Sequence, residues 1–128
     1  MSTALKMKRE EWRRFNPAKN IAAFRRAQSG LLDERREKAL EVAKGAASLL
    51  RQQFGAERVV LFGSLVNKEA FTSWSDIDLA VWGIAPDDFY SAVAAVTGLS
   101  TVFKIDLVEP DNCRKSIQDA IQKQGVEI

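Results

Sequence analysis

Two aspartates, Asp76 and Asp78, lie one residue apart in the short apolar segment DIDLAVW, residues 76–82. Side chains alternate across a strand, so both carboxylates share one face of this predicted strand and the apolar side chains share the other. Two neighbouring carboxylates repel each other unless a cation lies between them, and their hard oxygen ligands suit Mg²⁺ or Mn²⁺. The alternative is a solvated strand face with two unrelated acids. It is less favoured because aspartate is depleted in strands.

A third aspartate, Asp106, lies in a predicted strand over residues 101–108, next to Lys104. If this strand neighbours the one that carries Asp78, the three acids come together and could hold two metal ions, as in phosphoryl and nucleotidyl transfer. Taken alone, Asp106 reads equally well as a surface acid. Lys104 either lies near a triphosphate or balances the charge of Asp106.

Gly63 and Ser64 follow the predicted buried strand over residues 58–62. Glycine lets the backbone approach a phosphate closely, and N–H groups at the start of a helical turn attract anions. Ser64 adds a hydroxyl donor. On its own a Gly-Ser turn is more often an ordinary loop, so its significance depends on the aspartates.

The elements that must position these residues follow from hydrophobic periodicity and from turn residues. Ser29-Gly30 is expected to end one helix, and Gly55 and Gly125 to end two others. Helices are predicted over about residues 5–15, 17–28, 33–54, 84–98 and 110–125, and strands over 58–62, 76–82 and 101–108. This order predicts an α/β (α+β) fold, a small mixed sheet packed by helices on one side.

The amino-acid composition limits the kinds of catalysis that this sequence can perform. The 128 residues contain no histidine and a single cysteine, so catalysis through histidine and an intrachain disulfide are excluded for this sequence. The chain has no apolar run of the roughly 18 residues that span a bilayer. Its N-terminus lacks the apolar stretch of a secretory signal. We therefore expect a cytoplasmic protein without membrane contact.

The charge is uneven. Residues 1–40 hold 11 Lys and Arg against 5 Asp and Glu, whereas residues 41–128 hold 8 against 12. We expect a basic helical arm over 1–30 and a catalytic domain over 31–128. The arm carries four large apolar residues, which favour docking on the body or on a partner: Trp12, Phe15, Ile21 and Phe24. A nucleic-acid contact is less favoured because its arginines alternate with acids and apolar residues.

Gly63-Ser64, eleven intervening residues, then SDIDLAV and finally Asp106 in KIDLV resemble the DNA polymerase beta-like nucleotidyltransferase superfamily. The pattern is most similar to its minimal nucleotidyltransferase (MNT) branch, whose members often pair with HEPN-domain proteins as toxin–antitoxin systems. The resemblance covers about residues 36–128. It implies that Gly63 and Ser64 bind a nucleoside triphosphate and that three aspartates are catalytic metal ligands: Asp76, Asp78 and Asp106.

The sequence departs from the family pattern directly after Ser64. Many relatives continue with arginines and a glycine, but here the residues are Leu-Val-Asn-Lys. The basic contribution to nucleotide binding is therefore expected to shift to Lys68, or to be weaker.

The resemblance implies a metal-dependent enzyme that transfers AMP from ATP to a hydroxyl group. A small-molecule acceptor would need a further helical domain, for which this sequence leaves no room, so the expected acceptor is a HEPN-domain partner, modified on a tyrosine. Homo- or hetero-oligomers are compatible with this expectation. The alternative function is a non-catalytic antitoxin or nucleotide-binding module that neutralises its partner by binding alone.

Overall fold

The computed structural model describes residues 17–128, and side chains from residue 21 onward. The helix expected over residues 5–15, with Trp12 and Phe15, lies outside the described residues.

Contacts divide the chain into two compact units, Met1–Leu31 and Leu32–Ile128. Among the side chains of the first unit that the structure describes, three large apolar ones are exposed: Ile21, Phe24 and Leu31. The separate roles expected for residues 1–30 and 31–128 stay a prediction.

Helix α2, Pro17–Phe54, contains 38 residues and runs through Ser29 and Gly30. The helix end expected at Ser29-Gly30 is therefore wrong. A glycine inside a helix costs only about 1 kcal/mol relative to alanine, and the flanking residues are mostly good helix formers. Despite the length of α2, no helix in the described part of the chain is long and apolar enough to cross a membrane.

The sheet has four strands in the order β3-β2-β1-β4. Strand β1 is antiparallel to β2 and to β4, whereas β2 and β3 run parallel. The strands are β1 Arg58–Phe62, β2 Ile77–Trp82, β3 Ile105–Val108 and β4 Val126–Glu127. The predicted small mixed sheet is confirmed. The strand predicted over residues 101–108 begins only at Ile105, and the two-residue edge strand β4 was not predicted.

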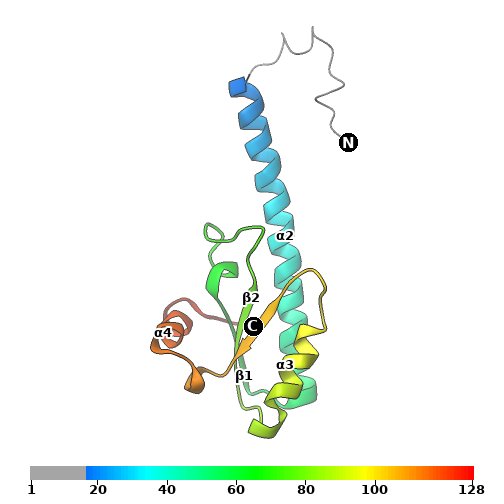
Figure 1. Cartoon of the computed structure of the whole chain (residues 1–128), viewed down its shortest axis with the longest axis vertical. Helices are drawn as coiled ribbons and strands as arrows, with labels where there is room; N and C mark the ends of the chain where they lie inside the picture. The colour runs from blue at the N-terminus through cyan, green and yellow to red at the C-terminus, as the bar shows by residue number, and fades with distance from the viewer. Residues whose placement is uncertain (1–16) are drawn as a thin grey trace. The chain divides into compact units, whose positions relative to one another are not determined.

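One face of the sheet packs against residues 32–54 of α2 and against α3, Phe89–Thr97, as Figure 1 shows. Every second residue of β2 is buried there, as the alternation predicts. The larger apolar core contains Ala39, Ala43, Ala47 and Leu50 of α2, Val59 and Leu61 of β1, Ile77, Leu79 and Val81 of β2, and Ile105 and Leu107 of β3.

The opposite face is partly covered by α4, Lys115–Gln124, so the expectation of helices on one side only is wrong. Ile121 of α4 is buried with Val60, Phe62 and Ala80 in a second, smaller cluster. These strand residues lie on the same face as Asp78, because Phe62 pairs with Asp78 and Val60 with Ala80. The turn after α4 leads directly into β4, which holds the helix close to β1.

Gly125, which joins α4 to β4, tests this packing. A Cβ atom there would lie 2.3 Å from the Ile121 carbonyl oxygen and 2.5 Å from Val60 Cγ1. We expect Gly125→Ala to lower the free energy of unfolding by about 1–3 kcal/mol through overpacking. Urea unfolding measures this change.

Gly45, on an exposed part of α2, is the matched control, because a Cβ there meets nothing within 4 Å. Gly45→Ala should raise the free energy of unfolding by about 0.5–1 kcal/mol. Equal effects of the two substitutions would contradict the close packing of α4 on β1.

Candidate active site

The parallel pairing of β2 with β3 brings two of the three predicted aspartates side by side. Asp78 and Asp106 are register partners on neighbouring strands, and both are half-buried. The expectation that the third strand neighbours the second is confirmed. Asp76 lies directly before β2, where the Ile77 N–H donates to the Lys104 carbonyl oxygen at 2.9 Å and fixes the start of the strand.

The electrostatics of Asp78 show how closely these charges are gathered. Partial burial, together with the charges of Asp106 and then Asp76, raises the pKa of Asp78 from 3.8 to about 6, against the opposing effect of Lys104. Burial and like charges both disfavour the ionised form of a carboxyl group. The apo site therefore carries an excess of negative charge that favours a cation.

Lys104 is one source of positive charge at this site. Its ammonium nitrogen lies 3.6 Å from Asp106 Oδ1, and both side chains are substantially exposed. This contact favours the charge-balancing interpretation of Lys104 over a direct role at a phosphate. An exposed pair of this kind is weak, so it leaves Asp106 able to exchange partners at little cost.

The Gly63-Ser64 turn is built against Asp78. Gly63 has φ +80° and begins the 3₁₀ helix η2, Gly63–Leu65. The positive φ favours glycine, and a Cβ atom on Gly63 would lie 2.3 Å from Asp78 Oδ2, so any other residue would force the carboxylate of Asp78 to move. Ser64 follows, half-buried, while the Leu65 side chain is fully buried in the core.

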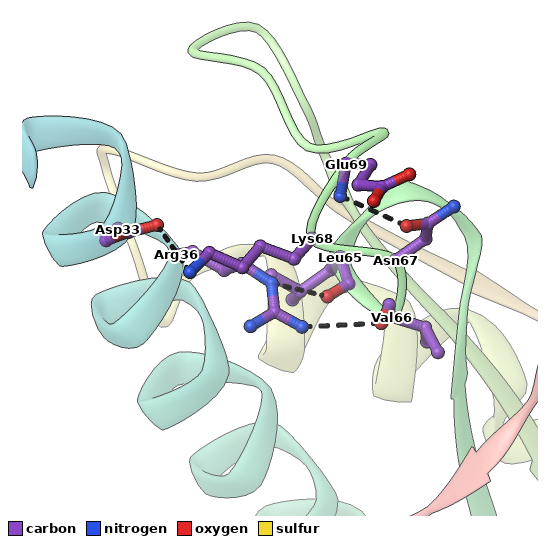
Figure 2. Close-up of polar contacts among 7 residues, drawn as sticks. All are labelled: Asp33, Arg36, Leu65, Val66, Asn67, Lys68 and Glu69. Carbon is purple, nitrogen blue, oxygen red and sulfur yellow. Dashed lines mark hydrogen bonds and ion pairs between the residues drawn. The ribbon is translucent and has the colours of Figure 1, made fainter. Parts of the chain in front are cut away.

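Lys68, the predicted basic ligand, lies on the loop after this turn. Its ammonium nitrogen is 3.4 Å from Asp33 Oδ1 on α2, and both side chains are exposed (Figure 2). In this arrangement Lys68 is paired with α2, so a phosphate contact would require it to leave Asp33.

The donor set is compatible with a magnesium or manganese ion. Asp78 and Asp106 offer hard oxygen ligands in register, and a divalent cation would favour the ionised form of Asp78 against the burial and the like charges that raise its pKa. As the side chains stand, residues 17–128 contain no group of three or more His, Cys, Asp or Glu that could hold a metal ion. Binding by all three aspartates would therefore require side-chain rotation.

Comparison with known proteins identifies the family of this chain. Residues 44–128 match the family described as "Polymerase beta, Nucleotidyltransferase". The chain belongs to this nucleotidyltransferase family. The matched segment contains all six predicted site residues. No curated protein matches the sequence.

Two solved structures are similar to this nucleotidyltransferase. One, "Crystal structure of the toxin-antitoxin with AMP-PNP", is 20% identical with a TM-score of 0.52, over 66% of this chain and 70% of that chain. The other, "Crystal structure the toxin-antitoxin MntA-HepT", is 18% identical with a TM-score of 0.49, over 69% of each chain. At this level of identity, the first of these likenesses supports the polymerase beta-like fold.

The sequence analysis of this nucleotidyltransferase missed Arg36. Its guanidinium, half-buried on α2, donates to the carbonyl oxygens of Leu65 and Val66 directly after Ser64. A signal for it was present in the sequence. Arg36 precedes Ala39 and Ala43 by three and seven residues and so lies on the apolar face of α2. A charged residue on such a face needs a polar partner.

The raised pKa of Asp78 predicts a pH dependence of stability. Between about pH 4 and 6 the folded protein keeps a proton on Asp78 that the unfolded chain releases. The contribution of Asp78 to the free energy of unfolding therefore falls as pH rises through this window. Without metal, Asp78→Asn should stabilise the protein above pH 6 by about 1 kcal/mol, after allowance for solvent screening, and this gain should fade toward pH 4.

Thermal unfolding in a chelating buffer across pH 4–8 measures this effect. Glu41→Gln, which removes an exposed carboxylate on α2, is the control and should show no such trend. A pH-independent difference between wild type and Asp78→Asn would contradict the repulsion described for the site.

Proposed function

We propose that this nucleotidyltransferase transfers AMP from ATP to a hydroxyl group of a protein partner. The observation that carries the proposal is the contact of the Gly63 turn with Asp78, which is itself in register with Asp106. A phosphate-binding turn and a pair of metal-binding carboxylates are thereby brought within reach of one substrate. The family supports a transferase reaction, and the nucleotide, acceptor and metal are our proposals.

Each residue has a role that follows from its position. The N–H groups of the turn and the Ser64 hydroxyl bind the phosphates of ATP, because donors at a helical start attract anions. Lys68, exposed and only weakly held by Asp33, supplies a further positive charge. The carboxylates of Asp76, Asp78 and Asp106 hold Mg²⁺ or Mn²⁺, which when bound lowers the pKa of the acceptor hydroxyl and neutralises the triphosphate.

At the α-phosphorus, the reaction forms one bond and breaks one. The acceptor oxygen bonds to the α-phosphorus, the bond from that phosphorus to the bridging oxygen breaks, and pyrophosphate leaves. Asp106 receives the proton of the acceptor hydroxyl. It is half-buried and lies beside Asp78, so it is positioned to act as both ligand and base.

The proposed acceptor is a tyrosine of a HEPN-domain toxin, with this chain as the antitoxin. The support is the motif pattern from Gly63 to Asp106 and the structural neighbour described as a toxin–antitoxin with AMP-PNP. Exposed Ile21, Phe24 and Leu31 add an apolar surface in the first unit of the kind that protein partners cover.

Neutralisation by binding alone is the second candidate. Two observations favour it: the pairing of Lys68 with Asp33, and the absence of a ready group of three metal ligands among residues 17–128. The two candidates differ in whether the partner is covalently changed.

Incubation of the purified protein with a HEPN partner, ATP and Mg²⁺ tests the reaction by mass spectrometry of the partner. We expect a mass gain of one AMP per event with wild type and with Glu41→Gln. Asp76→Asn and Asp78→Asn should each abolish the gain, because each removes a charged oxygen ligand. Binding of the partner without any mass gain would favour the non-catalytic candidate. Near-normal transfer by Asp78→Asn would exclude the proposed metal site.

The role of Ser64 is tested separately by nucleotide affinity. Ser64→Ala should weaken the binding of a non-hydrolysable ATP analogue with Mg²⁺ by about 1–2 kcal/mol, the scale of one charge-assisted hydrogen bond. Isothermal titration measures the affinity. Ser48→Ala, on an exposed position of α2, should bind as wild type does. Unchanged affinity in Ser64→Ala would remove this hydroxyl from the site.

A further inference from the structure

Arg36 of α2 makes two hydrogen bonds to the loop that carries the phosphate-binding turn. Its Nε donates to the Leu65 carbonyl oxygen at 3.1 Å and its Nη2 donates to the Val66 carbonyl oxygen at 3.3 Å. Figure 2 shows the guanidinium reaching from the helix to these two consecutive carbonyls. The contact joins segments about 30 residues apart in the chain.

The two carbonyls directly follow Ser64, so their orientation sets the path of the turn. Peptide units are planar, with the N–H opposite the C=O, so fixing a carbonyl also fixes the direction of the following N–H. The Val66 N–H donates back to the Gly63 carbonyl oxygen at 3.2 Å. The turn is thus held by its own hydrogen bond, by Arg36, and by the close approach of Gly63 to Asp78.

No neighbouring contact among the described residues does what the hydrogen bonds of Arg36 do. The ion pair of Lys68 with Asp33 also joins the loop to α2, but both groups are exposed and such pairs contribute little. Arg35, next to Arg36, places its guanidinium over the Phe103 ring, 4.6 Å from the centroid. Among these contacts, Arg36 alone bonds to the backbone after Ser64.

We propose that Arg36 is a positioning residue for nucleotide binding, which holds the Gly63–Leu65 turn in the conformation that receives the triphosphate. This inference rests on the proposed nucleotide site. Arg36 lies outside the segment that matches the family model, residues 44–128.

The chemistry of the side chain makes the proposal specific. A guanidinium presents several N–H donors in a rigid planar fork, which suits two adjacent carbonyls. A lysine ammonium is a single compact charge on a flexible stem and is poorly suited to hold both. Arg36→Lys therefore keeps the charge and loses the geometry, whereas Arg36→Gln loses both.

Arg51 offers a matched control on the same helix. Its Nη2 also donates to a main-chain oxygen, that of Ile128, in an exposed contact, and it lies 15 residues further along α2, a rise of about 22 Å. Arg51→Lys and Arg51→Gln make the same chemical changes at a distance from the turn. They report the effect of losing an arginine contact with a main-chain oxygen elsewhere on α2.

The experiment measures the dissociation constant of ATP with Mg²⁺ by titration, together with thermal unfolding, for wild type and the four variants. We expect Arg36→Gln to weaken nucleotide binding about tenfold and Arg36→Lys by a smaller factor, as for the loss of a charged hydrogen bond. Both Arg51 variants should bind as wild type does. A purely structural role would shift the melting temperature of folded protein without shifting this dissociation constant.

The outcomes separate the two proposals. Wild-type affinity in both Arg36 variants would overturn the positioning role and leave the nucleotide site standing. No binding of ATP by wild type would overturn the nucleotide site and the role of Arg36 with it. If Arg36→Gln does not fold, Arg36→Lys decides between these outcomes.

Discussion

Asp78 imposes the constraint on which the arrangement of the site depends. Its carboxyl is half-buried, faces the charges of Asp106 and Asp76, and lies against Gly63, where a Cβ atom would come within 2.3 Å of Asp78 Oδ2. Bringing like charges together in a partly buried site opposes folding, so other interactions must hold the strands in place. The opposite face of the sheet does this, because β1, β2 and β3 bury every second residue against α2 and α3.

The face of the sheet that carries Asp78 has an apolar part, covered by α4, and a polar part that holds the aspartates. Towards the end of β2, α4 packs Ile121 against Val60 and Ala80 and excludes water. Towards its beginning, Asp78 and Asp106 remain half-exposed. Because β1 is antiparallel to β2, its C-terminal end meets this polar part of the face, and Phe62 pairs with Asp78. The antiparallel pairing of β1 with β2 therefore places the turn at Gly63 next to the carboxylates.

Local sequence patterns predicted the parts of the fold that depend on local rules. The bounds of β1 are as predicted, and the alternation in residues 76–82 placed Asp78 opposite the core. The expected helix end at Ser29-Gly30 was wrong because turn propensities are weak beside a long helical segment. Edge strand β4 depends on pairing distant in the chain, which no local pattern encodes. The place of Arg36 on the apolar face of α2 signalled that it needs a polar partner, but not that this partner is the turn after Ser64.

Under the proposed metal site, three sources of positive charge would compete for the carboxylates: a proton, Lys104 and a divalent cation. Below about pH 6 a proton neutralises Asp78, and Lys104 lies beside Asp106 at 3.6 Å. A divalent cation bound as proposed would have to displace this proton and draw Asp106 away from Lys104, so its affinity would depend on these existing contacts. The exposed Lys104 contact is weak, whereas the repulsion at Asp78 grows as its proton is lost. The proposed metal site would therefore bind a divalent cation more readily above about pH 6, where Asp78 has lost its proton, than below it.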